Sequence, residues 1–220
     1  EINANGGADG KKIVVTDKDN KSETAEAATI TTNLVTQSKV NALVGPATSG
    51  ATAAAVANAG KAGVPLVTPS ATQDNLTKGQ DYLFRATFID SFQGQIIAKY
   101  TTDNLKAKKV VLYYDAIVLP GYYTETGKIV NQARGMGIKQ PIIGGDGFSD
   151  AKFVEQATPA AATDIYYVAG FSTEGEMTDK AKKFVEAYKA KYNEEPSMFA
   201  ALAYDSVYMV AEASKGAKNS

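Results

Sequence analysis

Glycines and hydroxyl-bearing residues gather in one short segment that follows an apolar run. Residues 45–52 have the G-x-x-x-x-G-x-T spacing of a phosphate-binding loop. Ala51 occupies the place of the lysine that reaches the β- and γ-phosphates, which argues against a nucleoside triphosphatase. A strand that leads into a helix start still presents unpaired N–H groups and a partial positive charge, which suit a small carboxylate. The alternative is that Ser49 only caps the helix.

A second hydroxyl-bearing segment, Thr68-Pro69-Ser70-Ala71-Thr72, follows the next predicted strand. Open α/β sheets bind ligands at the carboxyl ends of their strands. Two such segments on adjacent strands therefore indicate a ligand site more strongly than either does alone. The alternative is an ordinary turn before a short helical turn capped by Asp74 or Asn75.

Acidic and aromatic residues follow the later predicted strands. Asp146 comes shortly after the run Pro141–Ile143, in a glycine-rich turn, where its carboxylate would neutralise an ammonium group. The alternative is a turn aspartate that bonds to its own backbone. Tyr122 and Tyr123 are as suited to packing as to ligand contact. No second carboxylate is identified on a neighbouring strand end, so paired-acid hydrolysis has no positive support.

The composition excludes several classes of protein. The 220 residues include no Cys and no His, so there is no disulfide framework, ordinary zinc site, thiol nucleophile or Ser-His-Asp triad. The 23 Lys and Arg nearly balance the 24 Asp and Glu, and such a chain lacks the clustered positive charge of a nucleic-acid-binding protein. No apolar run approaches the roughly 20 residues that span a bilayer. We expect a protein without catalytic residues, metal or cofactor.

Short apolar runs alternate with helical periodicities along the chain. We expect strands at 13–17, 42–44, 64–68, 83–86, 110–114, 117–119, 141–143 and 165–168. We expect helices around 22–34, 49–59, 91–104, 125–136, 181–192 and 199–210. The helix at 125–136 is expected to bury Ile129, Val130, Ala133 and Met136. Strands that alternate with helices indicate βαβ units, parallel sheets and an α/β fold.

One place breaks this alternation. The strand-like runs 110–114 and 117–119 follow one another without a turn residue. Parallel neighbours need a crossover of about a dozen residues, usually a helix. Either residues 110–119 form one unusually long strand, or a crossover is absent between Asp115 and Ala116, and we expect the second.

In combination, these loops resemble a known family. The segments 44–52, 68–72, 90–94, 121–123 and 144–148, in this order, are similar to those of the type I periplasmic-binding-protein fold. More narrowly, they resemble the bacterial branched-chain amino-acid binding proteins of ABC importers, the LivJ-like group. The resemblance covers nearly all 220 residues. Against the family pattern, an N-terminal segment, a middle segment and a C-terminal segment are expected to be missing.

The resemblance implies a role for each loop. It assigns a ligand site to Ser49, Ser70, Ala71, Thr72, Tyr122, Asp146 and Phe199. Ser49 and the Thr72 amide would hold the ligand α-carboxylate, while the Ser70 carbonyl and the Thr72 hydroxyl would accept from the α-ammonium. Asp146 would counter the ammonium charge. Tyr122 would close over the ligand, and Phe199 would lie near the pocket for its side chain.

The resemblance also implies an architecture and partners. Residues 1–88 with 172–220 would form one lobe and residues 89–171 the other, each a mostly parallel sheet flanked by helices. An extracytoplasmic monomer would capture leucine, isoleucine or valine between the lobes and deliver it to the permease subunits of an ABC importer. The alternatives are a ligand-sensing domain of the same fold in a receptor or regulator, and a carboxylate-dependent hydrolase.

Overall fold

The chain folds into two compact units of α/β structure. The structure is a computed structural model, and it describes residues 1–106 and 116–215. Unit 1 comprises Glu1–Ile89 with Leu202–Ser220, and unit 2 comprises Asp90–Ala201. This division differs from the predicted lobes because residues 172–201 belong with unit 2.

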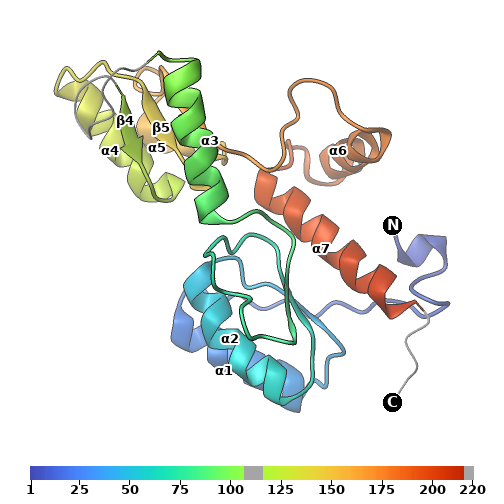
Figure 1. Ribbon diagram of the computed structural model, residues 1–220. Coiled ribbons are helices and arrows are strands. Elements are labelled where there is room, and N and C mark those ends of the chain that lie inside the picture. Colours follow the sequence, from blue (N-terminus) through green and yellow to red (C-terminus); the bar gives the residue numbers. More distant parts are fainter. Residues whose placement is uncertain (107–115, 216–220) are drawn as a thin grey trace. The chain divides into compact units, whose positions relative to one another are not determined.

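Unit 1 is a three-stranded parallel sheet with two packed helices. Its strands are β1 (Leu43–Val44), β2 (Leu66–Thr68) and β3 (Leu83–Arg85), in that order. Helices α1 (Thr24–Thr36) and α2 (Ser49–Lys61) lie side by side (Figure 1). A small residue on α2 allows this approach, since a Cβ at Gly50 would lie 3.4 Å from Cγ2 of Thr24 in α1. Elsewhere on α2, Ala55 and Ala59 are fully buried in a core that includes Leu66.

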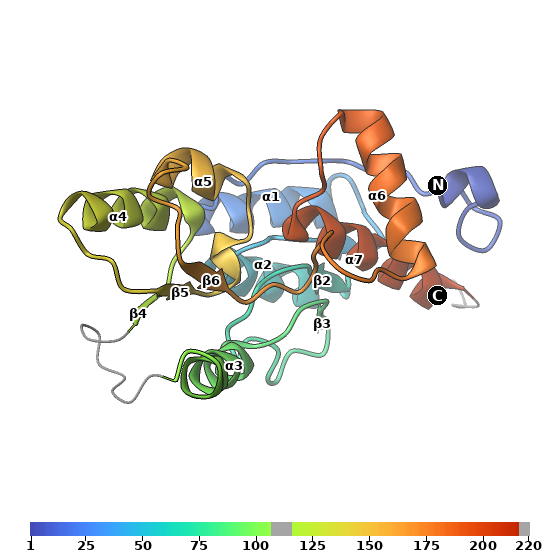
Figure 2. The ribbon, with the colours of Figure 1, turned by 90° about the horizontal axis from the view of Figure 1, so that it is seen from above.

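Unit 2 contains a second three-stranded parallel sheet, covered on both faces. Its strands are β4 (Ile117–Leu119), β5 (Ile142–Gly144) and β6 (Ile165–Tyr167), in that order. Helix α3 (Asp90–Asp103) lies on one face, and α4 (Tyr123–Gly135) and α5 (Lys152–Ala157) lie on the other (Figures 1 and 2). The core on the α4–α5 side consists of Val130, Ile142, Phe148, Phe153 and Ala157. Burial on both faces explains why β5 is wholly apolar.

Residues 172–201 join unit 2 through sulfur and ring contacts, and the helix that begins at Met198 passes into unit 1 from Leu202 onward. Helix α6 (Asp179–Tyr192) begins after Thr178, whose hydroxyl accepts from the N–H of Ala181 at 3.2 Å. The ring of Phe184 in α6 meets that of Phe171 edge-on at 5.9 Å. At the start of α7 (Met198–Ser214), the sulfur of Met198 accepts from the N–H of Gly170 at 3.1 Å. These contacts are the physical reason why residues 172–201 group with unit 2.

The structure confirms the α/β class and the parallel sheets but not every predicted element. The predicted strand at 13–17 is wrong: this segment forms no strand, and Val14 and Val15 are 87% and 73% exposed. The main chain of Ile13 bonds instead to the amide side chain of Asn3. The predicted strand at 110–114 and the proposed junction at Asp115 lie outside the described residues.

Helix α4 turns a different face to the core from the one its periodicity predicts. Val130 is buried as expected, but Ile129 and Met136 are 46% and 76% exposed. The buried face carries Thr126 and Gly127 instead. Helix α5 packs directly against Gly127, and a small residue there permits that approach.

The glycines of α4 provide a test of this packing. A Cβ at position 127 would lie 2.6 Å from the Cβ of Gln156, whereas a Cβ at Gly135 would meet nothing within 4 Å. Gly135→Ala should stabilise the protein by up to about 1 kcal/mol through helix propensity. Gly127→Ala should destabilise it by about 1–2 kcal/mol, because overpacking outweighs the same gain. Urea unfolding of both variants measures the effect, and a change of the same sign in both would contradict the packing described.

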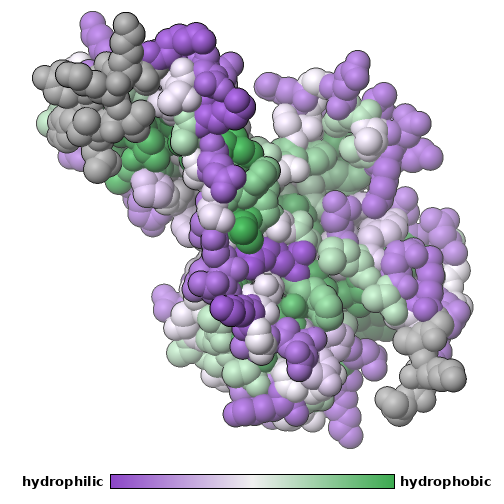
Figure 3. Space-filling view, in the orientation of Figure 1, coloured by the Kyte–Doolittle hydropathy of each residue, from purple (hydrophilic) through white to green (hydrophobic). Residues whose placement is uncertain are grey.

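In the part of the chain that the structure describes, we find neither a membrane-spanning helix nor a metal centre. Every helix there is too short or too polar to cross a bilayer. Within the same residues, no three acidic side chains lie close enough together to hold a metal ion. Hydrophilic residues cover much of the face seen in Figure 3, and hydrophobic surface lies near its centre. On α3, Phe92 and Ile96 are 48% and 39% exposed.

Candidate functional site

The first group of predicted site residues gathers at one edge of the unit 1 sheet. In the parallel pair β1–β2, Val44 is in register with Val67, so both strands end at the same edge. Ser49 starts α2 just beyond β1, and Ser70, Ala71 and Thr72 follow β2. The hydroxyl of Ser49 accepts from the N–H of Gln73 at 3.2 Å, which ties the two loops together.

The structure excludes the alternative interpretation, in which Ser49 only caps the helix. Thr48, in an extended conformation with φ −88° and ψ 150°, is the N-cap of α2, and it makes no side-chain cap bond. Ser49 is therefore the first helical residue and not the cap. The first N–H groups of a helix have no acceptors within it, and they carry part of the positive end of the helix dipole. This end of α2 is suited to an anionic ligand group.

Buried hydroxyl groups fix the shape of both loops. The hydroxyl of Thr68 donates to the carbonyl of Pro46 at 2.8 Å, and that of Thr52 lies 2.9 Å from the carbonyl of Thr48. The hydroxyl of Ser70 donates to the carbonyl of Ala47 at 2.9 Å. Ser70 is thus committed to the fold by its side chain, and its main-chain carbonyl is the group left to face a ligand.

The supporting role of Thr52 and Thr68 was missed in the sequence analysis. Both side chains are fully buried, and their hydroxyls lie 3.3 Å apart. Buried hydroxyl groups are costly unless they are hydrogen-bonded. A threonine at the buried end of a strand beside another threonine on the adjacent helix is the signal that could have indicated them.

The second group of predicted site residues gathers at the carboxyl end of β5 in unit 2. Asp146 begins the 3₁₀ turn η2 (Asp146–Phe148) and is partly buried. Its Oδ1 accepts from Nε2 of Gln93 at 3.1 Å, and its own N–H donates to Oε1 of Gln93 at 3.0 Å. Burial raises the pKa of Asp146 above its ordinary value of 3.8. The hydrogen bond from Gln93 lowers this pKa in part, and the negative charge of Asp90 raises it further.

Tyr122 lies beside this carboxylate, as the N-cap residue of α4. Burial raises the pKa of the Tyr122 hydroxyl, and the charges of Asp146 and Asp90 raise it further. The loops that carry Tyr122 and Asp146 are in close contact, because a Cβ at Gly147 would lie 2.4 Å from the carbonyl oxygen of Gly121. The neighbouring Tyr123 packs against the hydrophobic core instead, which resolves the choice that its sequence left open.

Phe199 stands apart from both groups in its contacts. It is the second residue of α7 and is partly buried. Among the described residues, no hydrogen bond or ring contact joins it to Tyr122 or Asp146. Its assignment to the ligand site remains a prediction.

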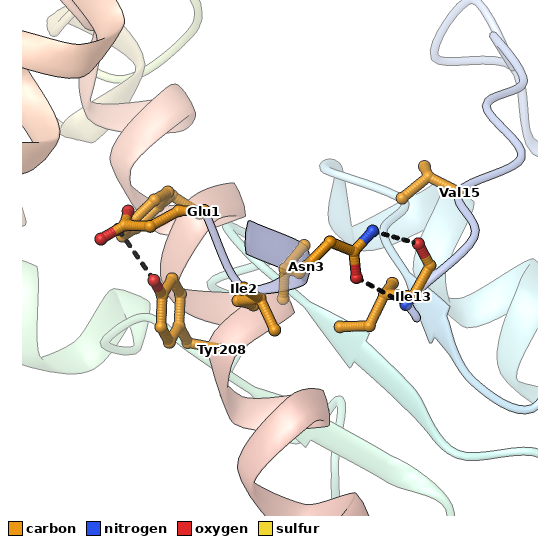
Figure 4. A pocket seen from close by; sticks show the side chains of 8 residues that line it. Glu1, Ile2, Asn3, Ile13, Val15 and Tyr208 are labelled. Atoms are coloured by element: carbon orange, nitrogen blue, oxygen red, sulfur yellow. Dashed lines mark hydrogen bonds between the residues drawn. The ribbon is translucent and has the colours of Figure 1, made fainter. Parts of the chain in front are cut away.

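Two further cavities lie in the units, and the larger one is lined in part by Met198, which precedes Phe199, and by Ser149, whose hydroxyl donates to the carbonyl of Asp146. A cavity of about 250 Å³ in unit 1 is lined by the N-terminal segment and α7. There the amide of Asn3 holds the main chain of Ile13 (Figure 4). A larger one of about 740 Å³ in unit 2 lies between α3, β6 and the segment 196–198. None of the predicted site residues lines either cavity.

Comparison with known proteins identifies relatives of this chain. The periplasmic binding protein family matches in two segments, residues 1–120 and 115–220. The Leu/Ile/Val-binding protein of Citrobacter freundii is 25% identical over 256 residues, which cover 90% of this chain and 66% of that protein. An amino acid binding protein of Pseudomonas aeruginosa is 30% identical over 79% of this chain and 47% of its own length. The chain thus spans less than two thirds of the length of these relatives.

Solved structures agree with these matches. The branched-chain amino acid transporter substrate-binding protein LivJ of Streptococcus pneumoniae, solved in complex with isoleucine, is 58% identical with a TM-score of 0.93. The match covers 99% of this chain and 76% of LivJ. The leucine-binding protein LivK of Thermotoga maritima is 29% identical with a TM-score of 0.81, over 89% of this chain and 69% of LivK.

These matches confirm the predicted type I fold and the resemblance to branched-chain amino-acid binding proteins. The two family matches also meet at 115–120, where the sequence predicts an absent crossover. The relatives named above are binding proteins by description. The chain belongs to the periplasmic binding protein family.

Proposed function

We propose that this chain captures a branched-chain amino acid and delivers it to the permease subunits of an ABC importer. The single observation that carries the proposal is the state of Asp146. This carboxylate is partly buried with a raised pKa, and none of the ion pairs among the described residues involves it. A buried charge is costly unless a counter-charge pairs with it. The ammonium group of an amino acid supplies that charge.

The opposite end of a zwitterion suits the site in unit 1. The ligand α-carboxylate would accept from Ser49 and from the Thr72 amide near the start of α2, where the helix dipole favours an anion. The Ser70 carbonyl and the Thr72 hydroxyl would accept from the ammonium. Burial of the bound ligand would remove these charge-assisted bonds from water and strengthen them. Tyr122 would cover the ligand, and Phe199 would border its side chain.

The aliphatic side chain of the ligand would be recognised by its shape and its buried area. Burial contributes about 0.8 kcal/mol per CH₂, so one methylene discriminates only weakly. At that value per CH₂, we expect leucine, isoleucine and valine to bind with affinities that differ by roughly tenfold or less. The relatives whose names mention Leu, Ile and Val support this choice.

Isothermal titration calorimetry of the chain with leucine, isoleucine and valine tests the proposal. All three should bind, whereas lysine and glutamate should not. Ser49→Ala combined with Thr72→Ala should raise the Kd for leucine by about 10–100-fold, because bonds to a charged group are lost. Thr29→Ala, an exposed change in α1 away from these loops, should leave the Kd unchanged. Absence of binding by all three aliphatic amino acids would refute the proposal.

The proposal extends to the location, the oligomeric state and the activity of the protein. We infer an extracytoplasmic monomer that binds neither nucleic acid nor cofactor and catalyses no reaction, in keeping with the periplasmic family and the binding-protein relatives. Size-exclusion chromatography with light scattering would check the monomer. Turnover of any amino-acid derivative would instead revive an enzymatic function.

A further inference from the structure

A buried glutamine on α3 holds the carboxylate that the proposed function assigns to the ligand ammonium. Gln93 is 5% exposed, and it comes from a helix 53 residues before Asp146 in the chain. Its amide contacts the turn at the end of β5 twice, once at the carboxylate and once at the main chain. No role was assigned to this residue from the sequence.

The chemistry of the partners fixes the orientation of the Gln93 amide. A backbone N–H can only donate, so the atom 3.0 Å from the Asp146 nitrogen is the amide oxygen. An ionised carboxylate can only accept, so the atom 3.1 Å from Oδ1 is the amide nitrogen. Both assignments agree, and a flipped amide would place like groups against each other on both sides.

The same amide nitrogen also faces a second carboxylate. Nε2 of Gln93 lies 3.5 Å from Oδ1 of Asp90, one turn earlier on α3. An amide nitrogen has two hydrogens, so one can point to each carboxylate. Gln93 therefore lies between Asp90 and Asp146 and faces both carboxylates, whose charges repel each other.

The loop of Asp146 is built to admit this amide. A Cβ at Gly145 would lie 3.1 Å from Oε1 of Gln93, which is tighter than ordinary packing. Glycine at 145 thus permits the close approach. A carboxylate has about four lone-pair sites, so the bond at Oδ1 leaves acceptor capacity for an ammonium group.

We propose that Gln93 is the positioning residue of the ammonium site, holding the carboxylate of Asp146 in its ionised, ligand-ready orientation through a two-point bond to its side chain and main chain. The inference rests on the proposed function for the identity of the ligand. It concerns Gln93 acting through Asp146, not a contact of Gln93 with the amino acid. Asp90 and Tyr122 are the other titratable groups that interact with this carboxylate in unit 2.

The test is Gln93→Leu, which removes the amide and keeps the volume. The Kd for leucine at pH 7.5 should rise by about tenfold, since a bond that favours the charged carboxylate is lost. The Kd for 4-methylpentanoate, which is leucine without its ammonium group, should not change. Gln93→Glu, which cannot donate when ionised, should weaken leucine binding at least as much. Gln132→Leu, an exposed change on α4, should leave both affinities as they are.

The pH dependence separates positioning from mere structural support. Loss of the bond from Gln93 should raise the pKa of Asp146 further, so leucine binding by Gln93→Leu should fail at a higher pH than in the wild type. Equal weakening of leucine and 4-methylpentanoate, with an unchanged pH profile, would mean that Gln93 only supports the fold and would overturn the inference.

A ligand-free measurement keeps this inference distinct from the proposed function. NMR titration of the Asp146 carboxyl carbon reports its pKa directly in the wild type and in Gln93→Leu. A higher pKa in the variant is expected even if the wild type were found not to bind leucine, which would count against the proposed function alone. An identical pKa in the two proteins would overturn the role of Gln93.

Discussion

Asp146→Asn is expected to weaken leucine binding by about 100-fold or more while making the ligand-free protein more stable at neutral pH. The loss of affinity follows because hydrogen bonds to charged groups contribute about 1.5–3 kcal/mol each, and the counter-charge of the ammonium disappears with them. The gain in stability follows because an amide removes a partly buried charge that Asp90 repels. The amide oxygen can still accept from Gln93.

The size of this gain in stability depends on pH. Burial raises the pKa of Asp146 in the folded protein above the ordinary value of 3.8, so the folded state binds the proton more tightly than the unfolded chain does. The cost of ionising Asp146 is therefore absent below pH 3.8, develops as the pH rises through the raised pKa, and is constant above it. Asp146→Asn should gain about 0.5–1 kcal/mol at pH 7 and progressively less toward pH 3.8.

Calorimetry with leucine and urea unfolding at several pH values measure both effects. Asp81→Asn is the matched control, because this carboxylate is exposed in a turn of unit 1. Asp81→Asn should change neither the Kd for leucine nor the free energy of unfolding. If Asp146→Asn kept wild-type affinity for leucine, the assignment of the ammonium site would be wrong. A loss of stability at pH 7 would contradict the account of its burial.

Phe148→Ala is expected to produce the largest loss of stability among the changes considered. Phe148 is 1% exposed and ends the turn that begins with Asp146. Its ring stacks on Phe153 at 4.6 Å, and a Cβ at Gly144 would lie 2.5 Å from it. Truncation leaves a cavity that these backbone segments cannot fill, which typically costs about 3–5 kcal/mol.

Thermal unfolding followed by circular dichroism measures this change, with a fall in Tm on the order of 10 °C expected. Met136→Ala, a truncation at an exposed position of α4, should alter the Tm by no more than about 1–2 °C. Leucine binding by Phe148→Ala should also weaken, because the turn that presents Asp146 loses its anchor. A Tm close to that of the wild type would show that the ring is not part of a packed core.

The comparison of sequence and structure is most informative where the predictions failed. The run at 13–17 is β-branched and apolar, yet a strand also needs a neighbour with which to pair its backbone, and its propensity depends on that context. Periodicity placed Ile129 and Met136 in the core of α4, but the close approach of α5 at Gly127 turned another face inward. The short helix α5 was not predicted, since its six residues are too few for a periodic pattern.

The α/β class, the alternation of strands and helices, and the loops at strand ends where a ligand site is expected could all be predicted from the sequence, because they follow from local patterns of apolar, glycine and hydroxyl residues. The side chains that hold those loops could be identified only from the folded structure. Thr52 meets Thr68, and Gln93 meets Asp146, across 16 and 53 residues of chain. Such pairs form when packing brings distant segments together and leaves buried polar groups that must find partners, and no local pattern specifies that outcome.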